Sequence, residues 1–160
     1  MLDFRIQLVI VIAILFLLNR TINGALQKLG LQKSDEDIKD EKKIKELESS
    51  EYWKPSYYKD LLKKYPQKGR VALSNPNTVE AYAKQFNSAK GLFNDDEEKV
   101  FGIVRSMKYG TQLSQVSERF FVMYKKDLYN YLQGFMSESE LLRLAQLVSQ
   151  LETGLLKPKK

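Results

Sequence analysis

The chain has 160 residues, of which 43% are hydrophobic and 29% charged, enough for one compact domain with attachments. It contains neither Cys nor His, which excludes disulfides, cysteine-rich zinc sites, cysteine nucleophiles and imidazole bases. The net charge of +6 comes from 26 basic and 20 acidic residues that are interspersed, so nucleic acid is disfavoured as a partner.

An apolar run from residue 6 to residue 18, interrupted only by Gln7, predicts a hydrophobic helix within residues 1–24. As a helix this run spans roughly 20 Å, and its flanking residues extend it toward the ~30 Å core of a bilayer. Arg5 and Arg20 bracket the run, as is typical of side chains that reach the membrane interfaces. We therefore expect a single-pass N-terminal membrane anchor, which is formed by Ile6, Leu8, Val9, Ile10, Val11, Ile12, Ile14, Leu15, Phe16, Leu17 and Leu18.

Two alternatives to an uncleaved anchor are a cleaved signal peptide and burial of the same helix in a protein assembly. Arg5 is the only basic residue before the run and is countered by Asp3. No clear small-x-small cleavage site precedes Ala25, so an uncleaved anchor is favoured over a signal peptide. Burial in an oligomer stays open, because a helix that is apolar all round suits lipid and protein neighbours alike.

Residues 25–74 are interpreted as a charged and aromatic spacer. Ser34 is a candidate N-cap for a charged helix with acidic residues first and lysines later, as the helix dipole prefers. Ile38, Ile44 and Leu47 make a thin apolar stripe, which predicts a solvated helical spacer; a short coiled coil or docking helix is the alternative. The next cluster is predicted to cap a core and consists of Tyr52, Trp53, Pro55, Tyr57 and Tyr58.

Residues 75–153 show a clear helical period and no alternating strand pattern, so the predicted fold class is all-α, with about five short helices. The expected N-caps are Asn77, Asn94, Asp127 and Ser137. Gly91 and Gly154 are expected to end helices, and Gly110 is expected to separate the second helix from the third. The expected apolar faces are built from Val79, Tyr82, Phe86, Ala89, Val100, Ile103, Val104, Met107, Leu113, Val116, Phe120, Met123, Leu128, Tyr131, Leu132, Leu141, Leu144, Ala145, Val148 and Leu151. Residues 154–160 are predicted to be a frayed basic tail.

The segment from residue 77 to residue 151 resembles an annexin repeat. In that family a helix rich in Ala and Tyr is followed by Lys-Gly-x-Gly-Thr-Asp-Glu, and EAYAKQFNSAKGLFNDDEE holds the matching place here. The family's later Arg-Asp-Leu is echoed by Lys126, Asp127 and Leu128. The segment is also similar to single annexin-like repeats in proteins of Bacteroidetes and their phages. The resemblance implies a compact bundle of short helices, and the N-terminal hydrophobic helix lies outside the family pattern.

The calcium site that the resemblance implies lacks two of its parts in this sequence. The second glycine of the carbonyl-presenting turn is replaced by Phe93, and the position of the bidentate acid falls on Phe135. Because calcium needs six to eight oxygen ligands, we expect no calcium-dependent lipid binding, no metal and no cofactor. The acidic run from residue 95 to residue 98 is interpreted as favourable charge at a helix start.

The sequence does not predict an enzyme. The best acid–base candidates would be the carboxylates at residues 95–97, but carboxylates at a solvated helix start stay ionised. We expect a non-catalytic, membrane-tethered helical module that acts as a structural or protein-interaction component. The alternative is a structural component of a phage virion, whose apolar helix packs in an oligomer or inserts into a host envelope. The expected partners are a lipid bilayer or neighbouring subunits at the N-terminal helix, together with an unidentified protein.

Overall fold

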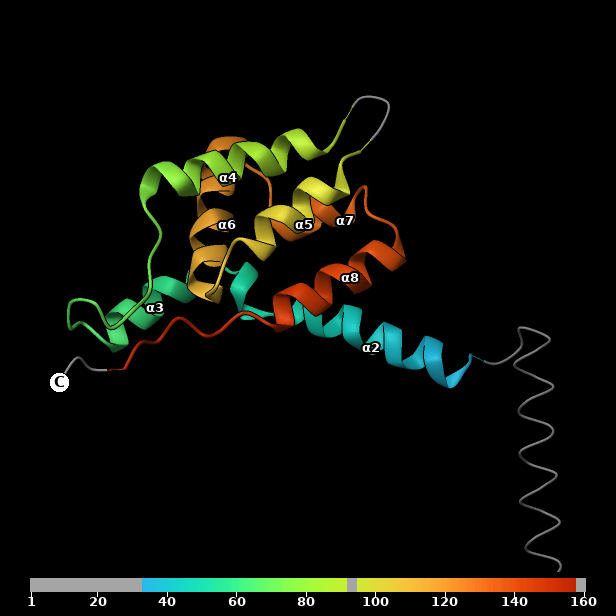
Figure 1. Cartoon of the computed structure of the whole chain (residues 1–160), viewed down its shortest axis with the longest axis horizontal. Coiled ribbons are helices and arrows are strands. Elements are labelled where there is room, and N and C mark those ends of the chain that lie inside the picture. The colour runs from blue at the N-terminus through green and yellow to red at the C-terminus, as the bar shows by residue number, and fades with distance from the viewer. Residues whose placement is uncertain (1–32, 92–94, 158–160) are drawn as a thin grey trace, which may run out of the picture. The chain divides into compact units, whose positions relative to one another are not determined.

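The structure, a computed structural model, describes residues 33–91 and 95–157 (Figure 1). The predicted anchor, from Ile6 to Leu18, lies outside the described residues. In the part of the chain that is described, no helix has the length and apolarity needed to cross a membrane. The helices in chain order are α2 (Asp35–Ser49), the 3-10 helix η1 (Glu51–Trp53), α3 (Tyr57–Lys64), α4 (Pro76–Ala89), α5 (Glu97–Arg105), α6 (Gly110–Tyr124), α7 (Leu128–Gln133) and α8 (Glu138–Ser149).

The chain divides into two compact units, residues 1–42 and residues 43–160. In the first unit the backbone amide of Asp37 donates a hydrogen bond to Ser34 Oγ at 3.0 Å, so the predicted N-cap of the charged helix is confirmed. Ile38 on the same helix is 53% exposed, as expected for a solvated spacer. The second unit begins inside α2, so the last part of the predicted spacer folds with the helical domain.

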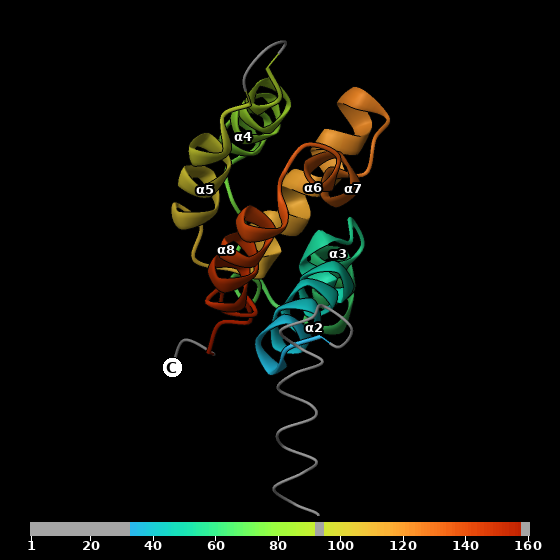
Figure 2. The same cartoon turned by 90° about the vertical axis from the view of Figure 1, so that its right-hand side faces the viewer.

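The described residues are all-α, as predicted, with two isolated β-bridges in place of any strand. In the second unit α6 packs against α3, η1, α4 and α7, while α5 packs against α4 and α8 (Figures 1 and 2). The aromatic rings of Phe86, Phe101 and Phe120 are fully buried in the resulting core. Helices α4 to α8 each bury most of the apolar face that their 3.6-residue period predicts, so packing of these faces holds the short helices together.

Two predicted helix starts need correction. Helix α4 begins at Pro76, and its N-cap is Asn75, whose side chain accepts a hydrogen bond from the amide of Asn77 at 2.9 Å. Proline is favoured at the first helical position because its φ is already helical and it has no amide hydrogen to satisfy. Helix α5 is capped by Asp96, which accepts from the amide of Lys99, while Asn94 lies outside the described residues. The predicted cap at Ser137 and the predicted cap at Asp127 are confirmed.

Gly110 lies at the boundary between α5 and α6, as predicted, whereas Gly154 does not end a helix, contrary to the prediction. Gly110 is the first residue of α6, and a Cβ atom there would collide with the ring of Tyr52. Gly154 lies beyond the end of α8, has a φ of +89°, and approaches the side chain of Thr111. Both glycines are therefore explained by close packing between distant segments, and at Gly154 also by a positive φ.

The tail is paired with an earlier segment, so the prediction of a frayed terminus is wrong for its described part. The amide of Ala72 donates to the carbonyl of Gly154, and the amide of Leu156 donates to the carbonyl of Arg70, both at 2.8 Å. Val71 and Leu155 form an antiparallel bridge between these two bonds. The pairing needs partners about 80 residues apart, which no local pattern in the tail could indicate.

Candidate partner-binding cleft

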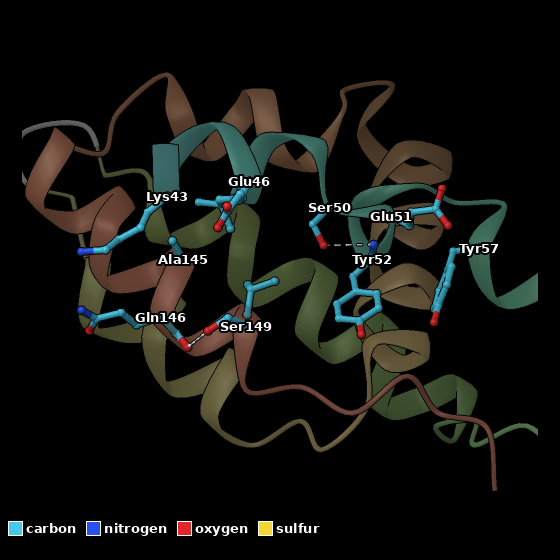
Figure 3. A pocket seen from close by; sticks show the side chains of 11 residues that line it. Lys43, Glu46, Ser50, Glu51, Tyr52, Tyr57, Ala145, Gln146 and Ser149 are labelled. Atoms are coloured by element: carbon cyan, nitrogen blue, oxygen red, sulfur yellow. Dashed lines mark hydrogen bonds between the residues drawn. The ribbon is translucent and has the colours of Figure 1, made fainter. Parts of the chain in front are cut away.

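A cleft of about 570 Å³ opens between the end of α2, η1, the start of α3 and the second half of α8 (Figure 3). Its apolar floor is provided by Leu47, Ala145 and Val148, which are all buried. We call this hollow, together with the side chains that line it, the cleft. The lining side chains are Lys43, Glu46, Leu47, Ser50, Glu51, Tyr52, Tyr57, Ala145, Gln146, Val148 and Ser149.

Trp53 fixes the α2 side of the cleft. Its side chain is 3% exposed, its ring lies 5.5 Å from the ring of Tyr129, and its Nε1 donates a hydrogen bond to the carbonyl of Leu47 at 2.8 Å. This bond satisfies a carbonyl in the last turn of α2, where helices leave such groups unpaired. Ser50 then caps η1 by accepting from the amide of Tyr52. The chain therefore turns sharply after α2 and presents both aromatic and aliphatic groups to the cleft.

Two tyrosines form one end of the cleft, as Figure 3 shows. The rings of Tyr52 and Tyr57 lie 5.2 Å apart, and the hydroxyl of Tyr57 donates to the carbonyl of Thr153 at 3.0 Å. Burial, together with the smaller effects of the neighbouring Tyr52 and Glu51, raises the pKa of Tyr57 to about 12. Burial also raises the pKa of Tyr52. Both hydroxyls are therefore protonated at neutral pH and serve as hydrogen-bond donors.

The rim of the cleft is polar. Lys43 and Gln146 lie toward the end opposite the tyrosines in Figure 3, and Glu46 and Ser149 lie between the two ends. Ser149 Oγ donates only to its own helix, to the carbonyl of Gln146 at 2.8 Å. An apolar floor with amide, hydroxyl and charged groups around it is the composition of a binding interface, where the floor excludes water and the rim fixes orientation.

The acidic run before α5 is engaged in local bonds. Asp95 accepts from the amide of Gly91 at 3.0 Å, and hydrogen bonds from the Lys99 ammonium and amide lower the pKa of Asp96. Glu98 forms ion pairs with Arg105 and Arg143. These contacts agree with the interpretation of the run as charge that stabilises a helix start.

Of the two positions that bear on calcium, Phe135 alone lies among the described residues. Phe135 packs against the core, with its ring 5.7 Å from the ring of Tyr131, while Phe93 lies outside the described residues. Across residues 33–91 and 95–157, no three His, Cys, Asp or Glu side chains are placed to hold one metal ion.

Comparison of the chain with family models, with curated proteins and with solved structures finds no match. The annexin resemblance therefore stays a prediction.

Sequence reasoning missed the cleft. The stripe of Ile44 and Leu47 was interpreted as too thin for a core, yet Leu47 is 3% exposed and Ile44 packs against the core. The signal that could have indicated the contact is the aromatic cluster just after α2, since Trp53 was expected to cap a core. The opposite wall, at Ala145 to Ser149, lies about 100 residues away in the sequence, and no local pattern pairs it with α2.

Proposed function

We propose that the chain is a non-catalytic, membrane-tethered helical module that binds a protein partner. The observation that carries the proposal is the cleft, a hollow that opens to solvent above an apolar floor and is surrounded by polar groups. Such a surface fits an apolar segment of a partner, for example one face of an amphipathic helix. The apolar run from residue 6 to residue 18 supports the tether, because it suits insertion in a bilayer.

The chemistry of the cleft supports binding over catalysis. The hydroxyl of Tyr57 is bonded to a backbone carbonyl, and its raised pKa keeps the proton in place at neutral pH. A general base near neutrality needs a pKa close to the working pH, which this group does not have. An annexin-like repeat over residues 77–151 belongs to the same proposal as the scaffold that supplies α8 to the cleft.

Fractionation of cells that express the full chain tests the tether. We expect the protein to sediment with membranes, to remain there in high salt, and to need detergent for release. Soluble oligomers that form without detergent would contradict the tether. They would favour the alternative of a virion component whose apolar helix packs between subunits.

A matched pair of substitutions tests the cleft. Ser149 and Ser88 are both exposed serines in the last turn of a helix, and each donates to the carbonyl three residues earlier. Ser149→Arg places a long charged side chain at the wall of the cleft, whereas Ser88→Arg makes the same change on α4. We expect the intact complex, purified from its native source and analysed by mass spectrometry, to lose its partner with Ser149→Arg alone. Equal retention by both variants would contradict the proposal.

A further inference from the structure

The segment around the end of α3 differs in charge from the rest of the second unit. Residues 59–70 contain five basic side chains and one acidic side chain, whereas residues 71–156 contain nine basic and ten acidic side chains. The positive charge of the folded domain is therefore concentrated in one short stretch, while the helices from α4 to α8 are close to neutral.

The C-terminal tail adds to this stretch. The hydrogen bond from the amide of Leu156 to the carbonyl of Arg70 places Lys157 beside the segment that follows α3. In Figure 1 the tail runs past the loop after α3. We call the resulting set of side chains the basic surface, and it consists of Lys63, Lys64, Lys68, Arg70 and Lys157.

The charges of the basic surface are largely uncompensated. Lys63 lies 3.5 Å from Asp60, but none of the other four side chains forms an ion pair with a carboxylate of the described residues. Two of them lie near the ring of Tyr65, with the Lys64 ammonium 5.6 Å and the Arg70 guanidinium 5.7 Å from its centre. Repulsion between these cations is unfavourable in the free protein, so an anionic partner would relieve it.

Exposed aliphatic side chains flank the basic surface. Leu62 is 37% exposed and precedes Lys63, while Leu73 is 47% exposed and follows the segment that pairs with the tail. Basic side chains next to exposed leucines are typical of surfaces that lie on a lipid bilayer, where ammonium groups meet headgroups and aliphatic groups enter the boundary below them. A nucleic-acid surface gains nothing from exposed leucines, since it relies on phosphate contacts and aromatic stacking.

We propose that the basic surface binds the anionic headgroups of a phospholipid bilayer. The proposal rests on the membrane tether of the proposed function, because a tethered domain meets the bilayer at a high effective concentration. The contact uses ammonium and guanidinium groups and needs no calcium, and its residues lie outside the segment that resembles an annexin repeat. It would hold the helical domain against the membrane in a fixed orientation.

A single fluorescent label tests the contact in the full chain. Because the chain has no cysteine, Gln67→Cys provides one attachment site in the middle of the basic surface for a polarity-sensitive dye. Gln67 is exposed, so the label perturbs little. The labelled protein is reconstituted in vesicles of phosphatidylcholine alone and in vesicles with about one third phosphatidylglycerol. We expect a blue shift of dye emission in the anionic vesicles only, unchanged by EDTA and lost in about 0.5 M NaCl, where charges are screened within a few ångströms.

Charge reversal provides the matched comparison. Each basic residue near an anionic surface raises the equilibrium constant for binding by on the order of fivefold. We therefore expect Lys64→Glu with Lys68→Glu to lower the equilibrium constant for binding of the domain to the anionic surface by roughly 25-fold or more. The control is Lys125→Glu with Lys126→Glu, which makes the same change in net charge beyond the far end of α6. We expect the control to keep the blue shift. Emission of Trp53, the single tryptophan, reports whether each variant retains its fold.

Different results of these vesicle experiments would contradict the lipid contact of the basic surface and the membrane tether. Protein that sediments with neutral vesicles but whose dye gives the same emission in both lipids would overturn the basic-surface proposal and leave the tether intact. Protein that fails to sediment with neutral vesicles would contradict the tether itself. A dye response to a DNA or RNA oligonucleotide without a response to anionic vesicles would overturn the lipid assignment in favour of nucleic acid. If the charge-reversed variant does not fold, the lipid and salt dependence of the unreversed labelled protein decides the question.

Discussion

The cleft and the basic surface use opposite ends of α3 and depend on different physical forces. Tyr57, at the first residue of α3, lines the cleft, while Lys63 and Lys64, in its last turn, belong to the basic surface. The cleft is held by buried side chains such as Leu47 and Trp53. In the basic surface, by contrast, the four lysines are exposed to solvent and Arg70 is half-buried. One short helix can therefore separate a surface whose stability depends on packing from a surface whose binding depends on salt.

The largest expected effect on stability comes from a substitution beside the cleft. Trp53→Ala removes a ring that is 3% exposed, its contact with Tyr129 and its hydrogen bond to Leu47. We expect the free energy of unfolding to fall by about 3–5 kcal/mol. Urea denaturation followed by circular dichroism measures the change.

A substitution in the basic surface is the control for this prediction. Lys68→Ala alters an exposed side chain of the basic surface, and we expect the free energy of unfolding to change by no more than about 0.5 kcal/mol. Equal losses in the free energy of unfolding for the two variants would show that the basic surface contributes to stability as much as the packed side chains beside the cleft.

A second prediction concerns the tail that links the two regions. Gly154→Ala places a side chain at a φ of +89° against Thr111, so we expect a loss of about 1–3 kcal/mol in the free energy of unfolding. The strain also weakens the pairing of Ala72 with residue 154, and hydrogen exchange at the amides of Ala72 and Leu156 should accelerate more than exchange in α6. Unchanged exchange at both amides would contradict the assigned role of this glycine.

A third prediction uses the pKa of Tyr57. Its pKa rises from an ordinary value near 10 to about 12 in the folded protein, so the fold favours the protonated form. The associated stability is present below pH 10 and is lost as the pH rises from 10 to 12. Tyr57→Phe cannot ionise, and we expect a shallower loss of stability across that interval.

The same variant has a small cost at neutral pH. It removes the hydrogen bond to the carbonyl of Thr153, which contributes about 0.5–1.5 kcal/mol. Denaturation curves at neutral and alkaline pH measure both effects, with tyrosinate absorbance as the direct record of ionisation. An identical pH dependence in the parent protein and the variant would show that Tyr57 is not responsible.

Helix positions were largely predictable from the sequence, because caps and apolar periods act within one or two turns. Ser137 was expected to open the last helix and does so through a capping box with Glu140. Asn77 was expected to open α4, but Asn75 does so, since the proline between them favours the earlier start. Such errors of a few residues arise where two local signals compete.

By itself, the sequence determined the all-α class of the described residues, because a 3.6-residue period of apolar side chains is a property of each segment alone. Tertiary structure decided which segments meet. It joined Leu47 to Val148 in the cleft, and it joined Arg70 to Leu156 beside the basic surface. Gly110 and Gly154 show the physical reason, since each is required by a neighbour that lies far away in the sequence. Contacts of this kind depend on how whole helices pack, and no local pattern of residues encodes them.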